Sequence, residues 1–144
     1  MVELLVVLAI VMIVSSVVFT AFRNLAQSKS LDGETARIAA ELGRARSLTL
    51  ASKYADQYGI HFATTSITLF QGSAYSASSA SNTVTTLSPQ VQIASSSFNG
   101  GGSNVIFQRL TGGTTQSGTI KISLKNGTSS KMITIYKTGT YEIQ

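Results

Sequence analysis

The residue with the clearest chemical role is Glu3, a carboxylate directly ahead of a long apolar stretch. Residues 4–22 are nineteen side chains without a charge. About 20 helical residues cross the roughly 30 Å hydrocarbon core of a bilayer, so this stretch is long enough to span a membrane. A carboxylate beside such a stretch is costly unless a positive group pairs with it. The sequence therefore predicts that Glu3 meets a cationic partner from another molecule.

The last third of the chain carries a second set of side chains with possible chemistry. Five cations are accompanied there by a single acid, Glu142, and such a set could hold the phosphates of a nucleic acid. The alternative, which we favour, is that lysines on the exposed face of a sheet confer solubility and discourage edge pairing. DNA is therefore a possible partner but not the favoured one. The cations are Arg109, Lys121, Lys125, Lys131 and Lys137.

The composition argues against catalytic and metal chemistry. The chain has no Cys, one His and six acids, and its formal net charge is +5. No set of nucleophile, base and carboxylate can be assembled from these residues. Calcium needs several oxygen ligands, usually including carboxylates, and residues 57–144 contain one acid. We expect His61 to lie at the surface or at a sheet edge. The sequence thus predicts a protein that is not an enzyme and has no cofactor and no metal site.

An amphipathic helix is expected to follow the apolar stretch, over residues 25–53. This segment contains no Pro, and apolar or small residues recur at helical spacing along one face. Charges of alternating sign occupy another face, where i,i+3 and i,i+4 pairs favour a solvated stripe. We expect any bend of the combined helix within residues 22–33. The apolar face comprises Leu31, Ile38, Leu42, Ala45 and Thr49, and the charged face comprises Glu34, Arg37, Glu41 and Arg44.

The remainder, residues 56–144, has the pattern of antiparallel strands. Its beginning predicts a hairpin, and its end alternates strictly and predicts a three-stranded meander with one buried face. The hairpin comprises 58–62 and 67–70, the meander comprises 119–124, 131–136 and 141–143, and weaker strand candidates are 83–87, 90–94 and 104–108.

These elements predict an α+β fold in two parts. Residues 1–24 form a hydrophobic transmembrane or filament-core helix. Residues 25–144 form a globular head in which the amphipathic helix packs on a carboxyl-terminal antiparallel β-sheet. A secretory signal peptide fits residues 4–22 less well, because no basic segment precedes them and the apolar run exceeds the usual 7–15 residues. An anchor on an unrelated domain is a further alternative, and Arg23 and Lys29 would then favour a cytoplasmic head.

The first ten residues, MVELLVVLAI, resemble the amino-terminal segment of type IV pilins and type II secretion pseudopilins. The resemblance implies a pilin-like fold and a filament subunit whose glutamate pairs with the terminal amine of a neighbouring subunit. It also implies cleavage by a prepilin peptidase if a leader is encoded. Carried onto this chain, the assembly residues are Glu3, Leu4, Leu5, Val6, Val7 and Leu8.

Two later segments are similar to the GspH/FimT group within this family. These are residues 37–47, RIAAELGRARS, and residues 59–62, GIHF. The resemblance implies a minor pseudopilin with one membrane span in the bacterial inner membrane and a head on the periplasmic or extracellular side. Its partners would be other pilin or pseudopilin subunits and the inner-membrane assembly platform. Some members of the group are minor pilins that bind DNA during natural transformation, which is the alternative function.

Overall fold

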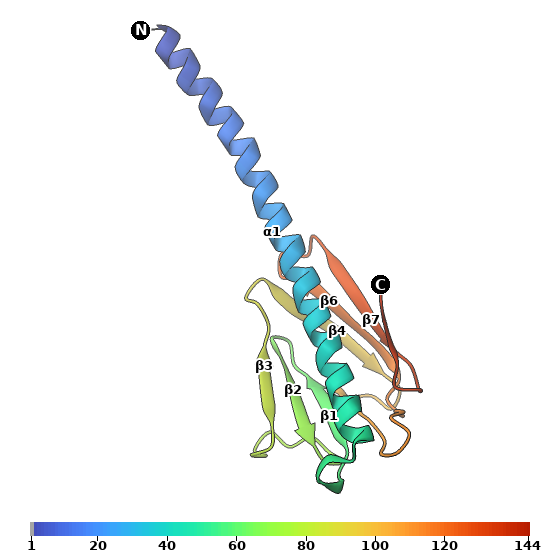
Figure 1. Cartoon of the computed structure of the whole chain (residues 1–144). Coiled ribbons are helices and arrows are strands. Elements are labelled where there is room, and N and C mark those ends of the chain that lie inside the picture. Colours follow the sequence, from blue (N-terminus) through green and yellow to red (C-terminus); the bar gives the residue numbers. More distant parts are fainter. Residues whose placement is uncertain (1) are drawn as a thin grey trace.

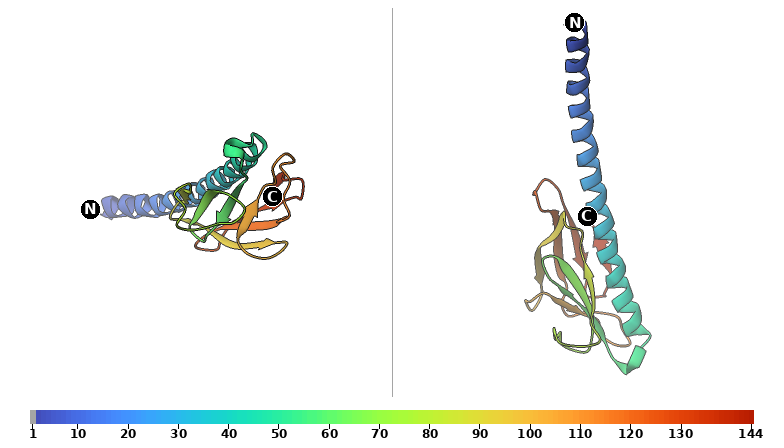
Figure 2. Two further views of the ribbon diagram at one scale, coloured as in Figure 1. Left: turned by 90° about the horizontal axis from the view of Figure 1, so that it is seen from below. Right: turned by 90° about the vertical axis from the view of Figure 1, so that its left-hand side faces the viewer.

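The computed structural model describes residues 2–144 and shows one long helix attached to a β-rich head (Figure 1). Helix α1 runs from Val2 to Leu50, 49 residues, without interruption through residues 22–33. At 1.5 Å per residue it extends over about 73 Å. Its amino-terminal half projects beyond the head, and its carboxyl-terminal half lies along the head (Figure 2). Met1, the first residue of the predicted segment 1–24, lies outside the described residues.

The carboxyl-terminal half of α1 buries the face that the sequence predicts. All five residues of the predicted apolar face are buried, together with Thr35 and Ala39. The hydroxyl of Thr35 donates to the carbonyl oxygen of Leu31 at 2.7 Å, and the hydroxyl of Thr49 donates to that of Ala45 at 2.9 Å. These hydrogen bonds satisfy the buried hydroxyls, so both threonines are compatible with an apolar interface.

The helix ends at Leu50, three residues before the predicted end at 53. The backbone enters the left-handed region at Ser52, with φ of 46°, and again at Tyr54, with φ of 57°. A right-handed helix cannot continue through residues in this conformation. A short 3₁₀ turn, η1 (Lys53–Ala55), then leads the chain from the helix into the first strand.

The first sheet contains β1 (Tyr58–Phe62), β2 (Ser66–Gln71), β3 (Thr83–Thr86) and β5 (Asn104–Ile106). Its order is β3-β2-β1-β5, and every pairing is antiparallel. β1 and β2 form the predicted hairpin, which is confirmed. The face of β1 that carries Tyr58, Ile60 and Phe62 is buried against the core, as its alternation predicts.

The second sheet contains β4 (Val91–Phe98), β6 (Gly118–Leu124), β7 (Ser130–Ile135) and β8 (Tyr141–Ile143). Its order is β4-β6-β7-β8, again antiparallel throughout. The last three strands confirm the predicted meander. β4 is longer than the predicted segment 90–94 and has a register shift between Ile93 and Ser95. A bulge of this kind lets a long strand bend.

The α+β prediction is confirmed, and the head consists of two antiparallel sheets that share one core with α1. The chain crosses from the first sheet to the second at residues 87–90, returns for β5, and crosses again before β6. Backbone hydrogen bonds connect the sheets: the amide of Leu87 donates to the carbonyl oxygen of Thr65, and the amide of Ile93 donates to that of Thr64. Phe62 and Phe98 meet between the sheets, with ring centroids 5.6 Å apart.

Candidate functional site

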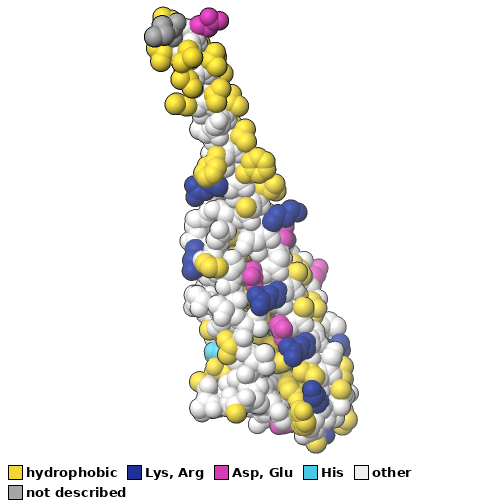
Figure 3. Space-filling model, turned by 60° about the vertical axis from the view of Figure 1, so that its left-hand side comes forward, with side chains coloured by type: hydrophobic (Ala, Val, Ile, Leu, Met, Phe, Trp, Pro, Cys, Tyr) yellow, Lys and Arg dark blue, Asp and Glu magenta, His cyan; other side chains and the backbone are white. Residues whose placement is uncertain are grey.

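The projecting half of α1 is a bare apolar helix. Residues 2–26 are all exposed, and the segment 4–22 makes the helix long and apolar enough to cross a membrane. Figure 3 shows hydrophobic side chains gathered along this half of the molecule. The hydroxyl of Ser16 donates to the carbonyl oxygen of Ile13 at 2.8 Å, and the hydroxyl of Thr20 donates to the carbonyl oxygen of Ser16 at 3.0 Å. Two of the three hydroxyls within the stretch are therefore satisfied by the helix itself, which suits an apolar environment.

The structure places the predicted assembly residues at the far end of this bare helix. Glu3 lies in the first turn of α1, and the five residues from Leu4 to Leu8 are each between 46% and 65% exposed. The next charged residue along the helix is Arg23, roughly 30 Å away at 1.5 Å per residue. Within residues 2–144, no cation forms an ion pair with Glu3.

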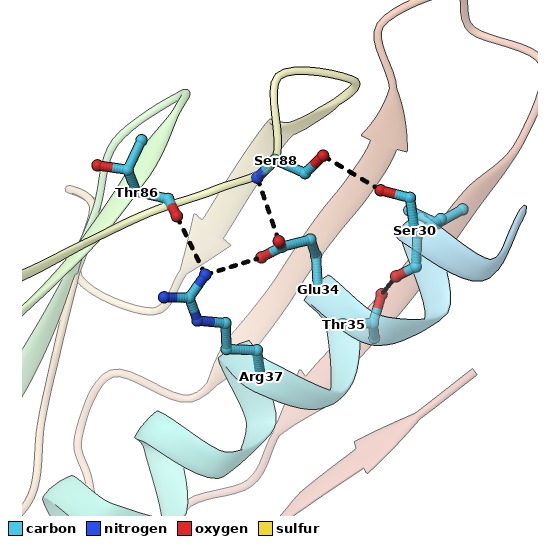
Figure 4. A network of polar contacts seen from close by, with 7 residues as sticks. Ser30, Glu34, Thr35, Arg37, Thr86 and Ser88 are labelled. Atoms are coloured by element: carbon cyan, nitrogen blue, oxygen red, sulfur yellow. Dashed lines mark hydrogen bonds and ion pairs between the residues drawn. The ribbon is translucent and has the colours of Figure 1, made fainter. Parts of the chain in front are cut away.

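A polar network attaches the head to the packed half of α1 (Figure 4). The Glu34 carboxylate accepts a hydrogen bond from the Ser88 amide at 3.2 Å. The Arg37 guanidinium donates to the carbonyl oxygen of Thr86 at 3.2 Å, and its Nη1 lies 3.8 Å from Oε2 of Glu34. The hydroxyl of Ser30 donates to that of Ser88 at 3.2 Å. The network fixes the crossover between the two sheets against the helix.

The network corrects part of the predicted solvated stripe. Glu41 and Arg44 form the expected ion pair at 3.4 Å, in which the Arg44 side chain is 53% exposed and the Glu41 side chain 21%. The side chain of Glu34, however, is only 14% exposed, because it turns toward the crossover at residues 86–88. The helical spacing identified the pair Glu34–Arg37 but contained no signal for the backbone amide that Glu34 binds.

A second attachment joins α1 to β7. Nζ of Lys131 lies 2.7 Å from Oδ1 of Asp32. This hydrogen bond from Lys131, with the charges of Lys131 and Lys29, lowers the pKa of Asp32 below its ordinary value of 3.8, against a smaller opposing effect of burial. Lys131 therefore already has a partner within the chain. Lys131 is two and four residues from the buried Ile133 and Ile135, so it lies on the same face of β7, which is the helix-facing side of the second sheet.

The other cations of the predicted set are dispersed over the head. Lys121 lies on the outer face of β6, between the buried Ile120 and Ile122. Lys125 is in the turn beside the start of the packed helix, where the neighbouring Asn126 donates to Gln27 at 3.0 Å. Lys137 lies in the turn at the opposite end of the head, where its carbonyl oxygen accepts a hydrogen bond from the backbone amide of Thr114.

Arg109, the last cation of the set, is exposed in the loop after β5, near that same far end. In this loop the Gly112 carbonyl accepts a hydrogen bond from Nε of Arg46 at 3.1 Å. The structure thus brings Arg109 and Lys137 to one end of the head. It places Lys125 at the other end and separates Lys121 from Lys131 on opposite faces of a sheet.

His61 lies on an outer face of the head, in keeping with the surface location predicted for it, but not at a sheet edge. β1 is an interior strand of the first sheet, and the His61 side chain is half-buried on its outer face. Nδ1 of His61 lies 2.7 Å from Oδ1 of Asn104, and the imidazole stacks on Tyr75 with centroids 4.0 Å apart. Tyr75 comes from the Ser- and Ala-rich loop after β2, whose folding over the sheet has no sequence signal.

Metal ligation has no geometric support in the part of the chain that the structure describes. No group of three or more His, Asp or Glu side chains comes close enough together there to hold an ion. The features with functional potential are therefore the bare helix with Glu3 at its end and the surface of the head around it.

The overall architecture is pilin-like in its general form, since one long amino-terminal apolar helix packs on an antiparallel β-sheet head. Comparisons of the chain with protein-family models, with curated proteins and with solved structures found no match.

Proposed function

We propose that this chain is a minor pseudopilin, a structural subunit of a type II secretion pseudopilus or of a type IV pilus-like filament. The observation that carries the proposal is the bare half of α1, an uncovered apolar helix that ends in a carboxylate while the rest of the chain folds into a packed head. Monomeric soluble proteins rarely expose apolar patches larger than a few hundred Å². Lipid and, after assembly, the helices of other subunits would cover this surface.

In the proposed mechanism the helix has two successive environments. Before assembly it spans the bacterial inner membrane once, with the head on the periplasmic side, where the assembly platform receives it. On incorporation, residues 4–8 pack among the helices of neighbouring subunits, and Glu3 pairs with the terminal amine of one neighbour. An unpaired charge in low dielectric is strongly unfavourable, so this pairing fixes the axial position of the incoming subunit.

The dispersal of the five predicted cations favours this proposal over that of a DNA receptor. A nucleic-acid site needs cations on one continuous face, because affinity rises with the number of phosphates that are neutralised together. Here Lys131 is paired with Asp32, and Lys125 and Lys137 lie at opposite ends of the head.

The proposal is tested by Glu3→Ala in the full chain, expressed in its own host. Breaking a buried ion pair costs about 3–5 kcal/mol, so incorporation into sheared filament fractions should fall by roughly a hundredfold or more. The amount in the membrane fraction should stay unchanged, because removing a carboxylate does not weaken insertion.

The matched control is Glu41→Ala, which removes a carboxylate from the partly exposed ion pair with Arg44 on the same helix. This variant should be incorporated normally. Normal incorporation of Glu3→Ala, or an equal loss in both variants, would refute the role of Glu3 in assembly.

A further inference from the structure

Two hollows lie where the bare half of α1 enters the head. The first has a volume of about 260 Å³ and is lined by Gln27, Pro89, Gln90, Leu124, Lys125 and Asn126. The second has a volume of about 270 Å³ and is lined by Asn24, Gln27, Ser28, Leu124, Thr128 and Ser129. We call this region, residues 23–29 of α1 with the turn 124–129, the neck. The hydrogen bond from Asn126 to Gln27 crosses the neck and joins the turn to the helix.

The lining of the neck hollows is suited to an anionic, hydrogen-bonding ligand. It provides side-chain amides from Asn24, Gln27, Gln90 and Asn126, and hydroxyls from Ser28, Thr128 and Ser129. Lys125 adds a cation to the first hollow, and neither hollow is lined by a carboxylate. Amide and hydroxyl donors around an ammonium group match the acceptor oxygens of a phosphodiester.

The position of the neck along α1 places it at the depth of lipid headgroups. The uncharged stretch ends at residue 22, and Gln27 lies five residues further along the helix. At 1.5 Å per residue this is about 7 Å beyond the end of the stretch. A bilayer of about 40–45 Å with a hydrocarbon core of about 30 Å has a polar layer of roughly 5–8 Å on each side. A helix that spans with residues 4–22 therefore holds the hollows within this layer.

Two further cations flank this level along α1, Arg23 about 6 Å before Gln27 and Lys29 about 3 Å after it at 1.5 Å per residue. Arg23 and Lys29 are exposed on α1 on either side of Gln27 along the sequence. The acid nearest to them along the helix, Asp32, is paired with Lys131. The neck therefore presents Lys125 at the headgroup layer, with Arg23 at the inner boundary of that layer and Lys29 just outside it. A solubility role alone does not account for hollows lined by polar groups at this one level.

We propose that the neck binds the phosphate headgroups of anionic phospholipids through Lys125, with Arg23 and Lys29 on the adjoining turns of α1 adding positive charge near the membrane surface. The contact sets the depth of α1 in the membrane and seats the head on the bilayer surface. This inference rests on a membrane location of the bare helix and does not depend on filament assembly. Its failure is therefore distinguishable from failure of the Glu3 test.

The test uses the full chain in nanodiscs made of equal parts phosphatidylcholine and phosphatidylglycerol. Native mass spectrometry of the released protein measures the ratio of the two lipids that stay bound. We expect phosphatidylglycerol to be enriched, and Lys125→Gln to reduce the enrichment about fivefold. This factor corresponds to about 1 kcal/mol for one basic residue at an anionic surface.

The matched control is Lys137→Gln, which removes the same charge from a turn at the opposite end of the head. It should leave the enrichment unchanged. An unchanged ratio for Lys125→Gln, an equal loss in both variants, or no enrichment in the unaltered chain would overturn the proposal. A further arm adds soluble glycerol 3-phosphate: displacement of the bound lipid would show that the hollows take a free phosphate ester, and would also overturn it.

Discussion

Gly59 provides the sharpest test of how the outer face of the first sheet is covered. A Cβ added at Gly59 would lie 2.5 Å from Cζ of Phe70 and 2.7 Å from the carbonyl oxygen of Val105. Phe70 is 1% exposed and meets Tyr75 edge to face, with centroids 5.5 Å apart. Since the carbonyl belongs to a paired strand and the ring is enclosed, neither neighbour can move freely. We therefore expect Gly59→Ala to destabilise the head.

The magnitude follows from the cost of overpacking. Forcing extra atoms into a packed region costs typically about 1–3 kcal/mol. At about 4 °C per kcal/mol for a cooperative unit of roughly 120 residues, the Tm should fall by about 4–12 °C. Gly33→Ala is the matched control, because Gly33 is an exposed helical position where an added Cβ meets nothing within 4 Å. Ala is better than Gly in a helix by about 0.5–1 kcal/mol, so this variant should raise the Tm by about 2–4 °C.

Thermal unfolding of the full chain in detergent, followed by the β-sheet signal in far-ultraviolet circular dichroism, measures both changes. A double-mutant cycle with Phe70→Leu then separates the two clashes. Leucine lacks the ring atoms that meet the added Cβ, so Gly59→Ala should cost less in that background, with a coupling of about 0.5–3 kcal/mol. A Gly59→Ala variant with an unchanged or raised Tm would refute the placement of the Phe70 ring over Gly59.

Two titrations test the ion pair and the hydrogen bond at the second sheet. Lys131→Gln removes the hydrogen bond that lowers the pKa of Asp32, so the pKa should rise toward 3.8 in an NMR titration. In the unaltered chain the pair stabilises the head above about pH 4, and the stabilisation disappears as the pH falls through the lowered pKa. The Tyr136 hydroxyl donates to Glu142 at 2.7 Å, which raises the pKa of Tyr136 above 10.0. Glu142→Gln should lower this pKa toward 10.0 in an ultraviolet titration, and an unchanged value would contradict the contact. The bond stabilises the fold below pH 10, and that contribution disappears as the pH rises through the raised pKa.

The parts of the fold that the sequence predicts are those in which local periodicity and burial agree. The apolar face of α1 and the alternation of Ile120, Ile122 and Leu124 are patterns of a single element, and both faces are buried as predicted. The hairpin turn and the meander turns likewise depend on neighbouring residues. No long-range information was needed for these elements.

The division of the strands between two sheets could not be predicted in the same way. It depends on β4 pairing with β6 and β5 pairing with β1, across 20 or more residues of sequence, and neither strand has a pattern that selects its partner. The partial covering of His61 also depends on a distant residue, Tyr75. For the candidate site, the spacing identified Glu34 and Arg37, but their backbone partners at Thr86 and Ser88 come from the crossover between the sheets.

The same features of the bare helix explain why Glu3 should matter for assembly and not for insertion. Glu3 is the only charged residue among residues 2–22, and the hydroxyls of Ser16 and Thr20 are satisfied by the helix backbone. In the proposed subunit, a helix that spans a bilayer would hold Glu3 at the boundary of the apolar stretch, where water and headgroups would solvate it. Inside a bundle of helices it loses that solvation, and only a cation from another subunit can replace it. Under the proposed function, the free energy that depends on Glu3 would therefore arise on transfer from lipid to filament, which is the step that Glu3→Ala isolates.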